Sequence, residues 1–367
     1  MSPSVRSALD PQRRASLFAA KLRSLVSEGW GVDSHTVREP GDLPGGAALF
    51  DRGQRRAWVL VEENPASALG RALTWATRPD VGGPMLRVDG ESVDLQVIIP
   101  AARGEDAPSR TNSGSAAVVA RQAGEFRTPI TVWAVSEAHL HQADPAPRHV
   151  AQPTPAGIES LIELMSTHGL TVRVDHGTLI GEWLGLEVAR VVIDPDGSPH
   201  LEVGVGRNDR EAFTMVHGLL PTPEAVAMVV ARVKRYRSAS DLTSPLTRLA
   251  RERWLLATLV LDGAPVGADS IEPVENTLPS ESVNDVVPAV GIGRSVVDGG
   301  PIVVACTAGI DVGLVPSVAD ARLAYAPGRP LVLAMAGHDR APLTDRLNSL
   351  LRQPAEIRVV PVPWQGR

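Results

Sequence analysis

The segment that most constrains the fold is 186–206, in which two apolar stretches flank a turn sequence. The turn reads Asp194-Pro195-Asp196-Gly197. Proline presets the backbone angle of the second turn position, and glycine closes the turn. The flanking apolar residues are Val188, Val191, Val192 and Ile193 before the turn, and Leu201, Val203 and Val205 after it. This pattern predicts a β-hairpin.

Two glutamates of this hairpin become neighbours if Ile193 pairs with Ser198. Glu187 and Glu202 then lie on one face, diagonal to each other and about 7–8 Å apart at Cα, close enough for both carboxylates to bind one divalent cation. A one-residue bulge at the turn would place them on opposite faces. The pairing register therefore decides whether the hairpin can hold a metal.

The order of elements around the hairpin resembles the restriction-endonuclease-like superfamily, whose motif is PD-(D/E)xK. A helix predicted over 158–165 comes before the hairpin, Glu187 matches the first acid of the motif, and Glu202 matches the second. Gly204 stands at the position of the motif lysine, and no Pro-Asp precedes the hairpin. The resemblance is therefore one of architecture, over about half of the chain.

This resemblance implies a metal-dependent nuclease activity, in which Glu187 and Glu202 hold Mg²⁺. The cation would polarise the scissile phosphate and lower the pKa of the attacking water. Another cation must then replace the motif lysine. Strand alternation directs Arg190 away from Glu187, so Arg207 is predicted to take this role. Arginine can stabilise a phosphate but is a poor proton carrier, because it is always charged.

The element order predicts an α/β protein of two tandem mixed-sheet units. The first unit, 1–143, reads helix, three strands, helix, strand, helix, strand. The second, 156–367, repeats the helix and three strands and ends in strand, helix, strand. The Pro-rich segment 144–155 is predicted to link them. An irregular insertion is predicted near 238–300, where few residues could build a core.

A divergent duplication of a restriction-endonuclease-like core would explain the repeated order. In the first copy Glu62 stands at the second acidic position, whereas Asn64 occupies the basic position and Ala47 the first acidic one. One carboxylate makes a weak Mg²⁺ site. The first unit is therefore predicted to be degenerate and catalytically inactive.

Composition predicts a cytosolic protein without a membrane partner. The chain of 367 residues is 43% hydrophobic and 21% charged, with no apolar run of membrane-spanning length and no apolar signal region. Its net charge is −6, and only Lys21 and Lys234 are lysines, a bias typical of GC-rich genomes. A single cysteine, Cys306, excludes an intramolecular disulfide and a cysteine-based zinc site.

A basic stretch between 232 and 253 is the candidate surface for nucleic acid or another partner. Such a density of cations can follow a phosphate backbone, although a solvated helix face is the plainer interpretation. The aromatic fraction of 4% is too low for a base-stacking platform. The stretch contains the cations Arg232, Lys234, Arg235, Arg237, Arg248, Arg251 and Arg253.

Three functions follow as hypotheses. The first is a non-catalytic, nuclease-like scaffold that binds nucleic acid or protein and needs no cofactor. The second is the Mg²⁺-dependent nuclease of the second unit, and the third is a small-molecule enzyme of unknown type, for which no dinucleotide, P-loop or nucleophile-elbow motif is present. His139, His141 and His149 form a possible metal pattern but are predicted to be solvated, and no bound zinc is expected.

Overall fold

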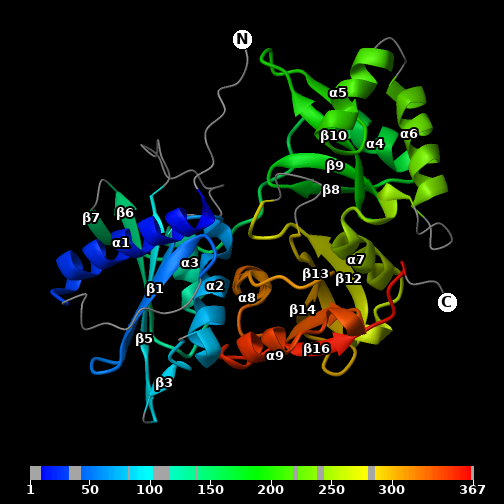
Figure 1. The fold of residues 1–367 in the computed structure, drawn as a ribbon. Coiled ribbons are helices and arrows are strands. Elements are labelled where there is room, and N and C mark those ends of the chain that lie inside the picture. The colour runs from blue at the N-terminus through cyan, green and yellow to red at the C-terminus, as the bar shows by residue number, and fades with distance from the viewer. Residues whose placement is uncertain are drawn as a thin grey trace, which may run out of the picture. The chain divides into compact units, whose positions relative to one another are not determined.

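The computed structural model describes residues 10–32, 43–81, 83–88, 90–101, 116–136, 139–217, 222–237, 244–279 and 286–364. The fold is mixed α/β, as predicted (Figure 1). The chain divides into two compact units. Unit 1 contains Met1–Pro147 and Pro342–Pro354, and unit 2 contains Arg148–Ala341 and Ala355–Arg367. The duplication stays a prediction.

Unit 1 is built on a five-stranded mixed sheet of order β1-β2-β5-β6-β7. The strands β2, β5 and β6 are parallel, and the two outer strands run antiparallel to their neighbours. Its strands are β1 (Gly46–Asp51), β2 (Arg56–Val61), β5 (Asp94–Pro100), β6 (Ile130–Ser136) and β7 (His139–Gln142), with the short ribbon β3 (Arg87–Val88) and β4 (Glu91–Ser92). Its helices are α1 (Pro11–Trp30), α2 (Ala68–Ala76), α3 (Ala116–Ala123) and α9 (Pro342–Ser349).

Helices cover both faces of this sheet. On β2, the alternating residues Trp58 and Val59 are both fully buried, which requires packing on either side. Leu22 and Val26 of the amphipathic helix α1 belong to the same core as Trp58. Near the end of β2, Glu62 pairs with Lys21 of α1 at 2.6 Å, so this predicted motif acid serves to join a helix to the sheet.

A late segment of the chain completes unit 1. The Arg352 amide donates to the Glu125 carbonyl at 2.8 Å, and the Arg127 amide donates to the Leu350 carbonyl at 3.0 Å. Arg346 of α9 donates to the Thr77 carbonyl after α2 at 3.2 Å. The domain boundaries predicted from the sequence, 1–143 and 156–367, did not assign this C-terminal segment to the first unit.

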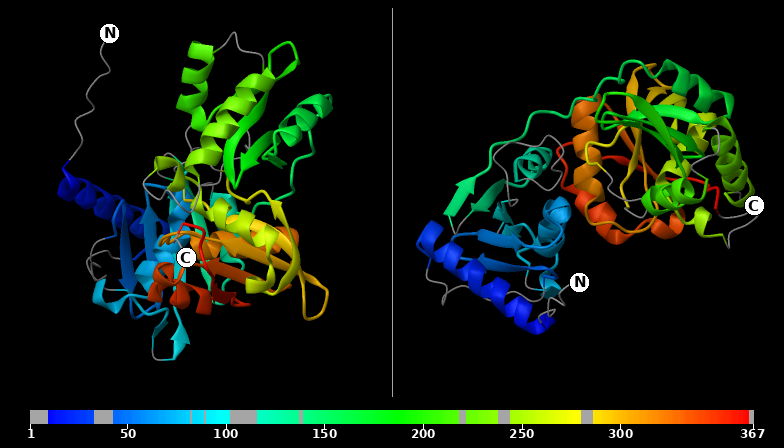
Figure 2. Two further views of the ribbon diagram at one scale, coloured as in Figure 1. Left: turned by 90° about the vertical axis from the view of Figure 1, so that its right-hand side faces the viewer. Right: turned by 90° about the horizontal axis from the view of Figure 1, so that it is seen from above.

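Unit 2 holds two sheets. The first is antiparallel, with order β11-β10-β9-β8. Its apolar residues form one core with those of the helices, chiefly α6. Figure 2 shows these elements in green from two further sides. They are α4 (Glu159–Thr167), β8 (Thr171–Asp175), β9 (Thr178–Trp183), β10 (Leu186–Ile193), β11 (Pro199–Val203), α5 (Gly206–His217) and α6 (Thr222–Tyr236).

The second sheet of unit 2 is mixed, with order β12-β13-β14-β15-β16 and parallel pairing of the last three strands. Helix α7 packs on one face, against Val304 and Cys306, and α8 packs on the other, against Val303 and Ala305. The elements are α7 (Arg251–Leu261), β12 (Ala268–Val274), β13 (Ala289–Ser295), β14 (Pro301–Cys306), α8 (Leu314–Tyr325), β15 (Leu331–Met335) and β16 (Glu356–Val359).

The prediction of an irregular insertion near 238–300 is wrong for the described residues of that range. They form α7, β12 and β13, and Trp254 and Leu255 of α7 are buried in the core. Strand β12 lies at a sheet edge and buries only some of its residues, so it carries a weak apolar pattern. Unit 2 consequently contains an antiparallel and a mixed sheet, and not the single mixed sheet that was predicted. None of the described helices has the length and apolar character needed to cross a membrane.

Candidate functional site

The predicted β-hairpin forms, but its register differs by one residue from the predicted one. Ile193 pairs with Pro199, and Arg190 pairs with Glu202. The cause is the turn: Gly197 adopts a left-handed φ of +86°, and the Asp194 amide donates to the Ser198 carbonyl at 2.9 Å. A type I turn followed by a left-handed glycine adds one residue to the loop and shifts the pairing.

A second irregularity brings Glu187 back to the face of Arg190. The pairing of β10 with β9 shifts between Glu187 and Ala189, as a β-bulge does. Arg190 donates from Nε and Nη2 to the two carboxylate oxygens of Glu187, at 2.8 and 3.0 Å. The prediction that Arg190 points away from Glu187 is therefore wrong, because simple alternation does not continue through a bulge.

The carboxylates of Glu187 and Glu202 do come together, but they contact the same arginine side chain instead of a metal site. Arg210 of α5 donates from Nη1 to Glu187 Oε1 at 2.9 Å, and its Nε lies 3.3 Å from Glu202 Oε2. Arg207, predicted to replace the motif lysine, is instead 85% exposed and pairs with Glu211. Sequence reasoning missed Arg210 because the helix that carries it was not predicted. The carboxylates assigned to Mg²⁺ are thus neutralised by guanidinium groups.

Arg237, predicted to contact nucleic acid, is a structural residue. It is 1% exposed, and its guanidinium donates five hydrogen bonds, of 2.7 to 3.1 Å, to four backbone carbonyls. Burial lowers the pKa of Arg237 to about 9, so the group stays charged at neutral pH. The four acceptors belong to Leu184, Leu246, Leu249 and Ala250.

The remaining cations of the predicted basic surface divide into two kinds. Arg251 donates to the Thr247 carbonyl at 3.1 Å, and Arg253 forms two ion pairs inside unit 2. The side chains of Arg232, Lys234, Arg235 and Arg248 are exposed, with the Lys234 ammonium 4.2 Å from the centre of the Trp183 ring. The basic stretch is therefore not one continuous patch.

Four charged residues form an ion-pair network beside α7. Arg173 and Arg253 each contact both Asp175 and Glu182, at distances from 2.8 to 3.2 Å. Burial raises the pKa of Asp175, but Arg173 and Arg253 lower it more strongly, to about 2. The same two arginines outweigh burial at Glu182 and lower its pKa. Both acids are therefore ionised at neutral pH, and the network is balanced in charge.

This ion-pair network forms one wall of a pocket of about 150 Å³ in unit 2. Apolar lining residues come from α7, which also carries Arg253 of the network, and from the loop before β13. The apolar lining residues are Leu256, Ala257, Val260, Leu261, Leu278 and Val287. A pocket with an apolar wall and a few fixed polar groups is the usual form of a binding site.

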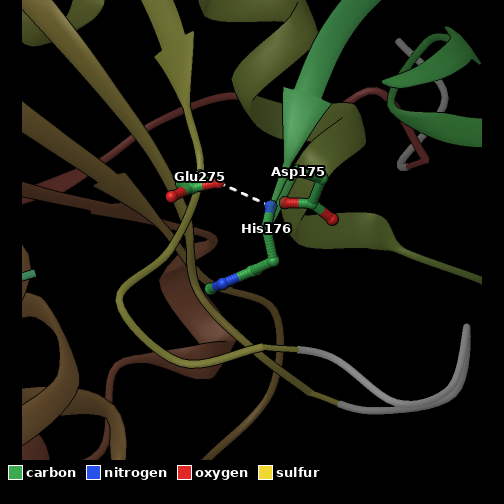
Figure 3. Close-up of side chains that lie close together, drawn as sticks. All are labelled: Asp175, His176 and Glu275. Carbon is green, nitrogen blue, oxygen red and sulfur yellow. Dashed lines mark hydrogen bonds between the residues drawn. The ribbon is translucent and has the colours of Figure 1, made fainter. Parts of the chain in front are cut away.

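Next to the pocket, Asp175 belongs to a second cluster with His176 and Glu275 (Figure 3). The His176 amide donates to Glu275 Oε2 at 2.5 Å, and His149 Nε2 lies 2.6 Å from Glu275 Oε1. Burial raises the pKa of Glu275, but these two hydrogen bonds lower it below its ordinary value.

The histidines of the predicted metal pattern have different environments. His149 was predicted to be solvated, which is wrong: its side chain is 13% exposed and is bonded to Glu275. His139 and His141 are exposed on β7, as predicted. His176 was missed, although Asp175, His176 and Gly177 form a recognisable turn sequence.

Comparison with known proteins gave no match: no family model, no curated protein and no solved structure resembles this chain closely enough to report. Function is therefore inferred from the geometry of the site.

Proposed function

We propose that this chain is a non-catalytic binding protein, and that the pocket of unit 2 holds an apolar side chain of a partner polypeptide. The observation that carries this proposal is the pocket itself, which is lined both by apolar residues of α7 and by the ion-pair network of Arg173, Asp175, Glu182 and Arg253. An apolar group could bury against α7, while polar groups around it contact the fixed charges.

The size of the pocket fits a single side chain. Its volume of about 150 Å³ resembles that of an engineered protein cavity that binds benzene. A leucine, methionine or phenylalanine side chain is of this size. The ligand must carry at least one such apolar group.

The rim of the pocket favours a polypeptide over a free small molecule. Of the lining residues, Leu261 is 81% exposed and Val260 is also exposed, as is Val286, the chain neighbour of the lining residue Val287. A ligand of one ring would leave these apolar side chains in water. Exposed apolar residues gathered around a pocket are typical of protein interaction surfaces.

The hairpin supports the non-catalytic interpretation over the nuclease. Glu187 already forms ion pairs with Arg190 and Arg210, and Glu202 forms one with Arg210. Both hairpin carboxylates pair with arginine, so a Mg²⁺ ion there would have no ligand free of guanidinium repulsion, whereas Glu275 of the cluster with Asp175 and His176 is contacted by His149 and the His176 amide.

The positions of the cations support a protein partner over nucleic acid. Arg237 and Arg253 use their guanidinium groups inside unit 2. Of the predicted surface, four cations keep exposed side chains on a chain of net charge −6, namely Arg232, Lys234, Arg235 and Arg248. Few phosphate contacts make weak, strongly salt-dependent binding.

The proposal can be tested by filling the pocket. Ala257→Leu adds a larger side chain to the α7 wall, and Ala212→Leu makes the same change at an exposed position of α5. N-acetyl-leucinamide and N-acetyl-phenylalaninamide serve as probes of side-chain binding, followed by NMR of methyl groups in the whole chain. We expect the probes to shift the signals of Leu256 and Val260 in the wild type and in Ala212→Leu, but not in Ala257→Leu.

Melting curves of both variants identify any loss of folding. The proposal fails if millimolar probe leaves the methyl signals of the pocket unchanged in the wild type. It also fails if a folded Ala257→Leu variant responds to the probes as strongly as the wild type does.

A further inference from the structure

We propose that Asp175, His176 and Glu275 form a binding site for a divalent transition-metal cation such as Zn²⁺. The three residues come from two different sheets of unit 2. Asp175 ends β8, His176 lies in the turn to β9, and Glu275 follows β12. This site is separate in function from the apolar pocket, although Asp175 borders both.

The geometry of the cluster suits one metal ion. Each residue offers one ligand atom, and these three atoms all lie within 4.8 Å of one another. Small movements of the side chains would bring them to about 2.0–2.2 Å from a shared Zn²⁺ ion. Figure 3 shows the two carboxylates on either side of the His176 backbone, with the imidazole extending from the same turn.

His176 is held in place by the turn and has an unused ring nitrogen. Asp175 pairs with Thr178, so His176 and Gly177 are the two central turn residues, and both have positive φ. The bond from the His176 amide to Glu275 fixes the turn against the second sheet. His176 Nε2 is buried and has no hydrogen-bond partner among the described residues. Burying an imidazole nitrogen without a partner is unfavourable, and a cation bound at that nitrogen would remove the cost.

The neighbours of the two carboxylates act as supports. His149 contacts one oxygen of Glu275, while Arg173 and Arg253 contact the oxygens of Asp175. A carboxylate oxygen has two lone pairs, so it can accept one hydrogen bond and still bind a metal. Metal-binding carboxylates are commonly hydrogen-bonded in this way, which fixes their orientation.

The ligand set selects the class of cation. One imidazole nitrogen with two carboxylates favours Zn²⁺ and similar transition metals, whereas Mg²⁺ prefers oxygen ligands and water. The guanidinium groups of Arg173 and Arg253 reduce the affinity by repulsion. We therefore expect weaker binding than at a closed, four-ligand structural zinc site.

The test uses the full chain, ZnCl₂ and MgCl₂, with isothermal titration calorimetry and thermal melting. We expect Zn²⁺ to bind with one-to-one stoichiometry and to raise the melting temperature, because it binds the native state preferentially. The same concentration of Mg²⁺ should have a much smaller effect. His176→Asn should weaken Zn²⁺ binding at least tenfold and remove the thermal shift.

His176→Asn is a conservative test of the site, because asparagine readily adopts the left-handed turn conformation and should preserve the hairpin. Glu275→Gln keeps an acceptor for the His176 amide and removes one ligand charge, so it should also weaken binding. The control replaces both His139 and His141 by asparagine, which removes an exposed histidine pair on β7 and should leave Zn²⁺ binding unchanged.

Absence of saturable Zn²⁺ binding would overturn the proposal. Unchanged affinity in both His176→Asn and Glu275→Gln would do the same, as would loss of binding in the β7 control. Ala257→Leu should bind Zn²⁺ like the wild type, so that failure of the pocket proposal and failure of the metal proposal can be told apart.

Discussion

Replacing Glu252 by glutamine is expected to stabilise unit 2 at alkaline pH relative to acidic pH. Glu252 lies in the first turn of α7 and is 6% exposed. Burial raises its pKa from an ordinary 4.5 to about 7, although hydrogen bonding to its own backbone amide and the neighbouring arginines act in the opposite direction. A buried carboxylate is costly when ionised, and an amide of the same shape is not.

The sign and magnitude follow from this pKa. A folded-state pKa above the unfolded value means that the carboxyl stabilises the native state fully below pH 4.5 and loses this contribution as the pH rises through about 7. One pKa unit corresponds to about 1.4 kcal/mol, so the whole change is worth about 3 kcal/mol. Glutamine carries no charge and removes this pH dependence.

The assay is urea denaturation of the wild type and Glu252→Gln at pH 5 and pH 8. Far-UV circular dichroism follows unfolding, and hydrogen exchange of α7 identifies the transition of unit 2. The difference in unfolding free energy between variant and wild type should be about 2.5 kcal/mol more favourable to the variant at pH 8 than at pH 5, since the unfolded carboxyl is already partly ionised at pH 5.

Glu182→Gln is the matched control, because Glu182 is also buried but its pKa is lowered by Arg173 and Arg253. A lowered pKa contributes stability above the unfolded value, so this variant should lose stability at pH 8 relative to pH values below 4. An equal stability difference for Glu252→Gln at pH 5 and pH 8 would refute the reasoning, as would a change of opposite sign.

Three further predictions concern the cations. Arg237→Ala should lower the unfolding free energy by more than about 3 kcal/mol, since it leaves buried carbonyls without donors. Substitution of the exposed Arg235 by alanine should change it by less than about 0.5 kcal/mol, and urea denaturation measures both. Arg210→Ala should cost about 1–3 kcal/mol, because Glu187 loses one of its two arginine partners and keeps Arg190, and Arg207→Ala should cost little. Equal effects of the two would contradict the assigned pairing. In gel-shift assays at low salt, the wild type should not retard duplex DNA, and a salt-sensitive shift abolished by charge reversal of Arg232 and Arg235 would restore the nucleic-acid hypothesis.

Local features of this protein could be predicted from the sequence alone. The first unit was predicted to begin with a helix, and α1 forms over Pro11–Trp30 with Gly31 in the left-handed conformation at its end. Both strands of the 186–206 hairpin also formed where predicted. These elements depend on apolar periodicity, turn residues and helix ends, all of which act over a few neighbouring positions.

The candidate site was decided by tertiary structure. Arg190 was predicted to face away from Glu187, but a bulge between Glu187 and Ala189 places the two side chains on the same face of the sheet. Glu275 meets His176 across 99 positions of the chain, so no local pattern could relate them. Arg237 looked like a surface cation, and only the folding of backbone carbonyls around it made it an internal anchor. Sequence determines local preferences, whereas long-range packing decides which charges become partners, because burial and distance set their energies.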